Sequence, residues 1–175
     1  EHQIRAILTT PSRVAVGLEL GLLDVIQTSR EHELVGHLGP DLLGPDWDAA
    51  EAIARLTADP SIPVSVALLD QRNLAGVGNE FANELCFVRG LDPATPIGDV
   101  ADVPALVTLA KRMLHANRDR SIRSTTGDLR PGRTSWVFAR ESRPCRRCGA
   151  RIVKGRLGAS ATVQRDTYRC PHCQP

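Results

Sequence analysis

The stretch CRRCGARIVKGRLGASATVQRDTYRCPHC, from Cys145 to Cys173, holds four of the five cysteines of this chain. The cysteines form two Cys-x-x-Cys pairs that are separated by 21 residues. Four thiolates at this spacing are typical of a structural zinc site, in which a tetrahedral metal keeps no open position for water. We therefore predict one structural zinc ion held by Cys145, Cys148, Cys170 and Cys173.

Other uses of these cysteines are less consistent with the sequence. Structural disulfides belong mainly to secreted proteins, and the N-terminal residues EHQIRAILTT lack the basic and apolar regions of a signal peptide. A redox Cys-x-x-Cys would not need a second pair. A segment this short, with few apolar side chains, is expected to fold only around the metal. We interpret His172 as an exposed bystander and Cys86, within the apolar ELCFV, as a buried core thiol.

The positive charge of the chain is concentrated in two segments. The net charge is only +2, yet residues 140–175 hold nine Lys and Arg against two Asp and Glu, and residues 111–133 hold seven against two. This asymmetry is typical of a nucleic-acid-binding surface, although a solvated basic tail is the alternative. The sequence has no run of 18 apolar residues, so we expect no membrane span.

The N-terminal and central regions differ in their patterns. Residues 1–38 include VAVGLELGLLDVI and the weakly alternating HELVGHL, which indicate short strands at the end of a β domain. A turn-rich joint, LGPDLLGPDWD, then leads into helical sequence. We expect helices that begin with Asp46 or Asp48 as the N-cap, at Pro63 and at about Pro104.

A further informative stretch is LLDQRNLAGVGNEFANELCF, residues 68–87. It predicts two helices joined by a tight turn with Gly76 and Gly78, with Asn79 as the N-cap of the second helix and Gly90 as its end. Unpaired amides at a helix start, beside glycines that allow close approach, favour a phosphate-binding site. An ordinary helical corner is the alternative.

The motifs LLDQRNLAGVGNEFANE, CRRCG, QRDTYRCPHCQ and HLGPDLL together resemble the formamidopyrimidine-DNA glycosylase/endonuclease VIII family. LGLLDVI, STTGD and WVFAR are most similar to its actinobacterial endonuclease VIII branch, the Nei2 type. The resemblance implies an α+β fold in three parts. These are the remnant of an N-terminal β-sandwich (1–38), a helix–two-turn–helix DNA-binding domain (39–139) and a four-Cys zinc-finger β-hairpin (140–175).

The resemblance also implies an activity. Members remove oxidised, mainly pyrimidine, bases and cleave the abasic strand by β,δ-elimination, as bacterial cytoplasmic, nucleoid-associated monomers that flip the damaged nucleotide out of the stack. By residue, Asn79 with Gly76 and Gly78 would bind backbone phosphate at the lesion. Arg165 would grip phosphate and assist δ-elimination. His37 falls where relatives present a basic intercalating residue, or it is a solvated linker residue, and STTGD matches a mobile loop beside the base pocket.

One family motif does not occur in these residues. The family nucleophile is the N-terminal proline of Pro-Glu-Gly, and this motif is absent from the sequence. Both lysines, Lys111 and Lys154, lie in the helical domain and the zinc finger, not in the N-terminal catalytic part. We therefore expect the DNA-binding portion of a bifunctional DNA glycosylase and abasic-site lyase, inactive without its N-terminal catalytic part. The alternative is a non-catalytic zinc-finger DNA-binding module.

Overall fold

The computed structural model describes residues 3–175, and the chain divides into two compact units, residues 1–37 and 38–175. In the first unit, β1 (Ile4–Thr9) and β2 (Val14–Leu18) form an antiparallel hairpin in which Ile7 pairs with Val16. A 3₁₀ helix η1 (Thr28–Arg30) and a short helix α1 (His32–Val35) follow.

The strand prediction is confirmed for the β1–β2 hairpin and is wrong for the rest of this unit. LGLLDVI is not a strand, and HELVGHL contains helix α1. A strand needs a neighbour for its backbone hydrogen bonds, and among the described residues β1 and β2 pair only with each other. The helix instead satisfies its backbone locally, and an ion pair of 2.7 Å between Arg30 and Glu33 supports it.

The second unit is built around four helices: α2 (Ala49–Leu56), α3 (Val64–Leu69), α4 (Asn79–Arg89) and α5 (Val103–Asn117), with a 3₁₀ turn η2 (Ile97–Asp99). Asp48 caps α2 by accepting the backbone N–H groups of Ala50 and Glu51. Gly90 ends α4 in the left-handed conformation, with φ of 70°. Both caps confirm the sequence-based prediction. None of the described helices is long and apolar enough to cross a membrane.

The prediction that Asn79 is the N-cap of α4 is wrong. Gly78 occupies the cap position, and Asn79 is the first helical residue. The helix has no side-chain cap, because glycine has no side chain to supply one. The Asn79 amide donates to the backbone oxygen of Asp166, at 3.0 Å.

Two hydrophobic cores hold the second unit together. The larger core joins the four helices through aliphatic side chains that include Leu42, Leu56, Leu68, Leu85, Leu106 and Leu114. The smaller core lies between α4 and the C-terminal segment and contains Phe87, Val137, Cys145, Ile152, Tyr168 and Cys170. α4 contributes to both, so it connects the helical part to the segment with the cysteine pairs.

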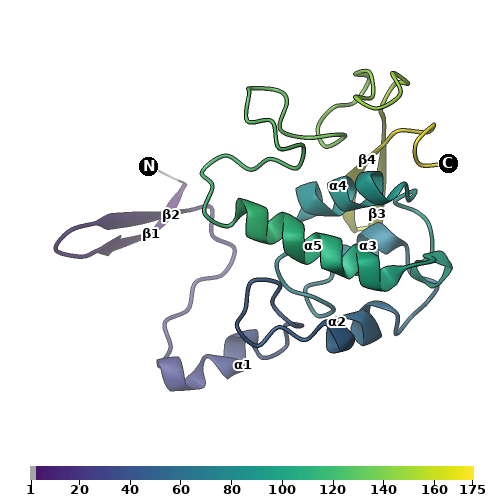
Figure 1. Cartoon of the computed structure of the whole chain (residues 1–175). Coiled ribbons are helices and arrows are strands. Elements are labelled where there is room, and N and C mark those ends of the chain that lie inside the picture. Colours follow the sequence, from purple (N-terminus) through teal and green to yellow (C-terminus); the bar gives the residue numbers. More distant parts are fainter. Residues whose placement is uncertain (1–2) are drawn as a thin grey trace. The chain divides into compact units, whose positions relative to one another are not determined.

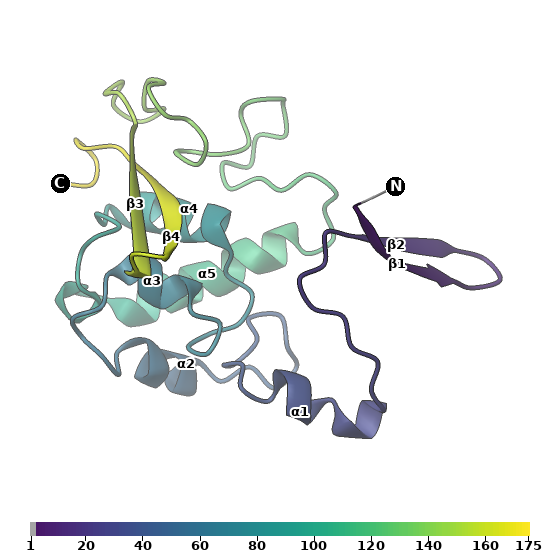
Figure 2. The same ribbon diagram turned by 180° about the vertical axis from the view of Figure 1, so that it is seen from behind.

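The cysteine pairs flank a β-hairpin, as the sequence predicted. β3 (Val153–Ser160) and β4 (Val163–Arg169) are antiparallel, and Leu157 pairs with Arg165. β4 packs on α4 and β3 packs on α3. The view from behind shows the hairpin crossing both helices (Figure 2), while Figure 1 shows α5 on the other side of α4.

Candidate metal centre and nucleic-acid interface

The four predicted ligands lie together in one cluster. The Sγ atoms of Cys145, Cys148, Cys170 and Cys173 are all within 4.8 Å of one another, and those of Cys148 and Cys170 are 3.4 Å apart. Zn–S bonds of about 2.3 Å in a tetrahedron place sulfur atoms about 3.8 Å apart. The cluster therefore has the size and the donor set for one metal ion.

Backbone and side-chain hydrogen bonds fix the two loops that carry these sulfurs. In the first loop, the N–H of Arg147 points at the Cys145 Sγ at 3.4 Å. In the second loop, the buried Gln174 accepts the N–H of Cys170 at 2.9 Å and donates to the backbone oxygen of Leu91 at 2.6 Å. The Gln174 side chain thus ties the second cysteine pair to the segment that follows α4.

The surroundings of Cys173 favour the protonated form of its thiol. Burial raises the pKa of the Cys173 thiol to about 12, and hydrogen bonds with Cys148 and Cys170 add to the effect. Four thiolates need a cation in their midst, because their negative charges repel one another at these distances. Metal binding at this cluster is therefore coupled to the release of protons.

The turn before α4 has the geometry that its glycines allow. Gly76 adopts a φ of 110°, and a Cβ there would lie 2.8 Å from the side chain of Leu114. The Gln71 side chain accepts the N–H of Gly76 at 2.9 Å and donates to the backbone oxygen of Val77 at 2.8 Å. At Gly78, by contrast, a Cβ would meet nothing within 4 Å. The start of α4 is thus rigidly held and open at Gly78.

Arg165 lies on β4 directly before the residue that bonds to Asn79. Its side chain is exposed and borders a cavity of about 340 Å³, together with Arg72, Leu69 and Leu157. Other basic residues of the hairpin are paired with acids: Lys154 and Arg156 with Asp166, and Arg169 with Asp92. No ion pair within residues 3–175 involves Arg165, so its charge is available to an anion.

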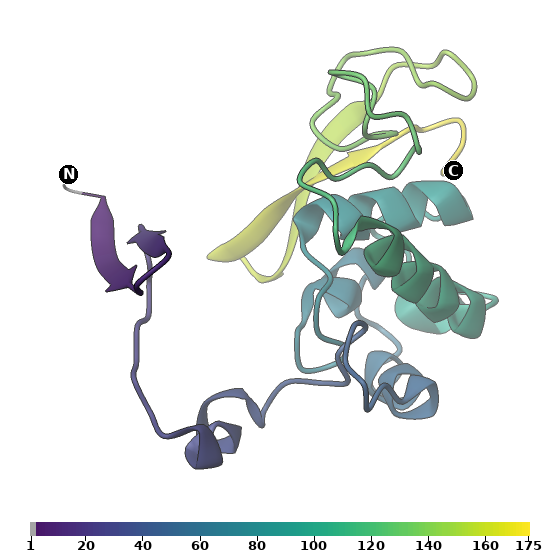
Figure 3. The same ribbon diagram turned by 60° about the vertical axis from the view of Figure 1, so that its left-hand side comes forward.

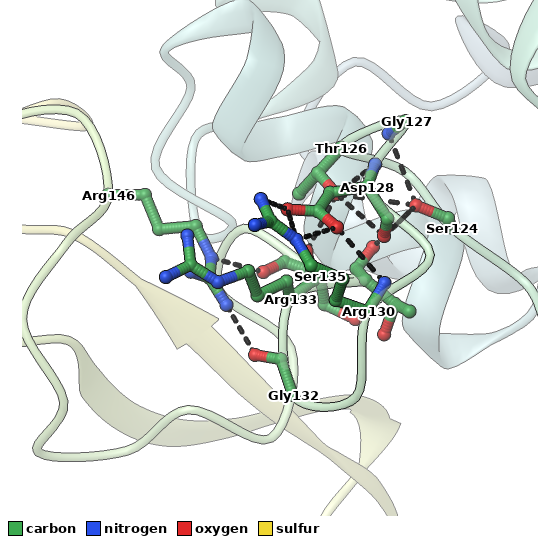
Figure 4. A network of polar contacts seen from close by, with 10 residues as sticks. Ser124, Thr126, Gly127, Asp128, Arg130, Gly132, Arg133, Ser135 and Arg146 are labelled. Carbon is green, nitrogen blue, oxygen red and sulfur yellow. Dashed lines mark hydrogen bonds and ion pairs between the residues drawn. The ribbon is translucent and has the colours of Figure 1, made fainter.

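The two basic segments of the sequence, residues 111–133 and the zinc-finger segment 140–175 (the finger), are in contact. Asp128 holds Arg130, whose guanidinium lowers the pKa of that carboxyl to about 2, and Ser124 donates to the backbone oxygen of Asp128 (Figure 4). Arg146, from the first cysteine loop, donates to the backbone oxygens of Gly132 and Ser135. Figure 3 shows the chain after α5 on the same side of α4 as the finger.

Glu84 is a site residue that the sequence analysis missed. It is fully buried, and its carboxylate accepts the backbone N–H groups of Trp136, Val137 and Phe138 at 2.7–2.8 Å, and the hydroxyl of Thr125. A signal was present, because Glu84 shares the buried face of α4 with Phe81, Leu85 and Val88 at helical spacing. An acid on such a face needs hydrogen-bond donors from elsewhere in the fold.

Three other residues that the sequence analysis discussed are His37, His172 and Cys86. His37 is exposed and ends the first unit, and His172 is exposed between two of the cysteines. Cys86 is fully buried in the larger core, and burial raises its pKa to about 12. The structure thus brings together Gly76, Gly78, Asn79 and β4 with Arg165, within one compact unit that also holds the cysteine cluster.

Comparison with known proteins gives close relatives in sequence. No protein-family model matches the chain. The chain is 53% identical over 175 residues to the probable endonuclease 8 2 of Streptomyces coelicolor, covering 99% of this chain and 62% of that protein. It is 49% identical over 173 residues to the DNA-(apurinic or apyrimidinic site) lyase Nei2 of Mycolicibacterium smegmatis, covering 99% and 67%. The chain thus spans 62–67% of the length of these relatives.

Solved structures share the fold. The MutM (Fpg) protein of Thermus thermophilus superposes with a TM-score of 0.70 at 26% identity, covering 98% of this chain and 68% of that one. The Lactococcus lactis Fpg, in complex with DNA that contains an abasic site, superposes with a TM-score of 0.63 at 25% identity, covering 85% and 56%.

Proposed function

Because this chain belongs to the formamidopyrimidine-DNA glycosylase/endonuclease VIII family, we propose that it is the DNA-binding portion of a bifunctional DNA glycosylase and abasic-site lyase. The reaction is removal of oxidised, mainly pyrimidine, bases, followed by β,δ-elimination at the abasic site. Relatives named endonuclease 8 and abasic-site lyase support this activity, and the Fpg complex with abasic DNA supports the partner. The chain acts as a monomer on a nucleotide flipped from the stack.

The single observation that carries the proposal is the meeting of α4 and β4. The Asn79 amide bonds to the backbone oxygen of Asp166, which directly follows Arg165, at 3.0 Å. A side-chain amide has two N–H groups, so one remains for a phosphate oxygen. Beside it, Gly78 leaves open space at the start of α4, where unpaired backbone amides favour an anion. An amide, an open helix start and the strand that carries Arg165, which has no ion pair within residues 3–175, thus lie together.

In this proposal the protein side chains hold the DNA backbone at the lesion. Asn79 donates to a phosphate oxygen and fixes the register of the strand. Arg165 forms a charge-assisted pair with a phosphate and stabilises the negative charge of the group that leaves in δ-elimination. The basic residues of the 124–135 loop and the finger extend the same positive surface along the backbone.

The metal in this proposal is one structural zinc ion at the four cysteines. Four sulfur ligands within 4.8 Å of one another suit zinc, which prefers tetrahedral thiolate coordination. When bound, the ion would cross-link the two loops at the base of the β3–β4 hairpin. Its role is to fix the hairpin that carries Arg165.

The test is the affinity of this chain for a duplex with one tetrahydrofuran abasic-site analogue. We expect Arg165→Ala and Asn79→Ala each to weaken binding by about tenfold, since each removes a hydrogen bond to a charged phosphate. If about four phosphates are neutralised, log K falls against log salt with a slope of about −3.6. Arg30→Ala, in the first unit, is the control with the same charge change. Unchanged affinity in both Arg165→Ala and Asn79→Ala, or binding that is insensitive to salt, contradicts the proposal.

A further inference from the structure

Asn83 lies one helical turn after Asn79 on α4, and its side chain is only 1% exposed. Its Nδ2 donates to the backbone oxygen of Asn79 at 2.8 Å, and it lies 3.3 Å from the Oδ1 of the same residue. It also lies 3.3 Å from the backbone oxygen of Asp166, while its Oδ1 accepts the N–H of Tyr168 at 2.6 Å. One buried side chain therefore contacts both elements of the interface.

These contacts orient Asn79. The Oδ1 of Asn79 faces the donor of Asn83, so the Nδ2 of Asn79 faces the Asp166 oxygen, which accepts at 3.0 Å. If the Asn79 amide rotated by half a turn, its Nδ2 would face the Nδ2 of Asn83 and its Oδ1 would face the backbone oxygen of Asp166. Neither pair could form a hydrogen bond. Asn83 thus selects the orientation in which a second N–H of Asn79 is left for a ligand.

The same contacts place β4. A two-stranded hairpin is only marginally stable by itself, and β4 pairs with β3 alone among the described strands. The ion pair between Lys154 and Asp166 lies within the hairpin and adds no link to α4. Asn83 attaches β4 to α4 at residues 166 and 168, directly after Arg165. Together with the Asn79 bond to Asp166 and the packing of Tyr168 in the smaller core, Asn83 therefore sets the position of the Arg165 backbone relative to α4.

We propose that Asn83 is a positioning residue that holds the Asn79 amide and the Arg165 guanidinium in register for one DNA backbone. The proposal rests on the function proposed above and assigns a role to a residue that does not itself touch DNA. It makes a specific demand: removal of Asn83 should cost affinity by way of Asn79 and Arg165 and not independently of them.

A double-mutant cycle tests this demand on the zinc-loaded chain, with the tetrahydrofuran duplex as the probe. We expect Asn83→Ala to weaken binding by about tenfold and to make the salt slope less steep by about one unit, as for the loss of one phosphate contact. In a background that carries both Asn79→Ala and Arg165→Ala, the same substitution should weaken binding by less than about twofold, because coupled residues are not additive. An equal loss in both backgrounds overturns the proposal.

Asn83→Asp covers the case in which the alanine variant loses its fold. The aspartate keeps an acceptor for the N–H of Tyr168 but sets a second oxygen against the oxygens of Asn79 and Asp166. We expect it to retain zinc and to bind the duplex about tenfold more weakly. Zinc content and a thermal unfolding curve check that each variant is folded. Wild-type affinity in Asn83→Asp overturns the proposal.

Asn117→Ala is the matched control. Asn117 is 7% exposed and makes three hydrogen bonds, donating to the backbone oxygens of Met113 and Ser124 and accepting the N–H of Ser124. These bonds do not involve β4, so its effect should be the same in the wild type and in the background with both Asn79→Ala and Arg165→Ala. If Arg165→Ala alone leaves binding unchanged, the proposed phosphate contact fails and the inference fails with it. If Arg165→Ala weakens binding and Asn83→Ala costs as much affinity in the background with both Asn79→Ala and Arg165→Ala as it does alone, only the inference fails.

Discussion

Glu84 sets the position of the chain that enters the finger. Its carboxylate has lost its hydration, and three backbone N–H groups and a hydroxyl replace the lost water. These donors come from residues 125 and 136–138, which lie at least 41 residues from Glu84 along the chain. A single acid on α4 thereby fixes the segment that supplies Val137 to the smaller core.

We predict that Glu84→Gln lowers the free energy of unfolding by about 3 kcal/mol. The glutamine keeps the shape but replaces one acceptor oxygen with an NH₂ group, which then faces backbone N–H donors. Urea unfolding followed by circular dichroism measures the change. Glu51→Gln is the control, because exposed Glu51 pairs with Arg55 on the surface of α2 and should change stability by less than about 1 kcal/mol. A Glu84→Gln protein as stable as the wild type would contradict this role.

At the scale of the elements, the finger and the helices have separate cores that meet at α4. The helices α2 to α5 pack through the larger core, which contains none of the four clustered cysteines. The smaller core contains Cys145 and Cys170, and Phe87 of α4 stacks on Trp136 with ring centroids 5.6 Å apart. Loss of the metal should therefore disorder the finger and leave the helical core intact.

We predict that Cys145→Ser, or a strong chelator, unfolds residues 140–175 while the far-ultraviolet signal of the helices is largely kept. The chain has two tryptophans, and Trp47 packs against the larger core. In a Trp47→Phe background, the fluorescence of Trp136 therefore reports the smaller core, which joins α4 to the finger. We expect a red shift on metal removal that returned zinc reverses in the wild type. Loss of the helical signal at the same chelator concentration would show that the two cores unfold together.

Element boundaries could be predicted where the signal is local. Asp48 and Gly90 were identified correctly because a cap acts within one turn of its own helix. The prediction failed for Asn79, whose side chain is engaged by a strand 87 residues away, and for HELVGHL, which has no strand to pair with among the described residues. The cysteine spacing predicted the cluster. It contained no information about Asn83 or Gln174, because their roles arise only when α4 and the finger pack together.

For the molecule as a whole, the surroundings of the two lysine amines bear on whether either can attack an abasic site. Lys154 is ion-paired with Asp166 at 2.9 Å, and that hydrogen bond raises the pKa of its ammonium group. A protonated amine is not a nucleophile. The other lysine, Lys111, lies over the ring of Trp47, with its Nζ 4.8 Å from the ring centroid. It belongs to α5, and neither the turn at residues 76–79 nor β4 contains it.

We therefore predict that neither lysine of this 175-residue polypeptide forms a Schiff base with abasic DNA, while the polypeptide still binds it. Borohydride reduction with a labelled abasic duplex, followed by denaturing electrophoresis, measures trapping. The same chain preceded by a Pro-Glu-Gly-containing family N-terminal segment is the positive control. A trapped complex that Lys154→Arg or Lys111→Arg abolishes would contradict the prediction.

In the proposed function, damaged DNA is held where the start of α4 meets β4. A ¹H–¹⁵N nuclear magnetic resonance titration of the zinc-loaded chain with the tetrahydrofuran duplex locates this contact residue by residue. We predict that the largest shifts fall on the side-chain amide of Asn79, the Nε–H of Arg165 and the backbone amides of residues 76–80, with smaller shifts in the 124–135 loop. Shifts confined to other surfaces, such as α2, with the Asn79 and Arg165 signals unmoved at saturation, would contradict it.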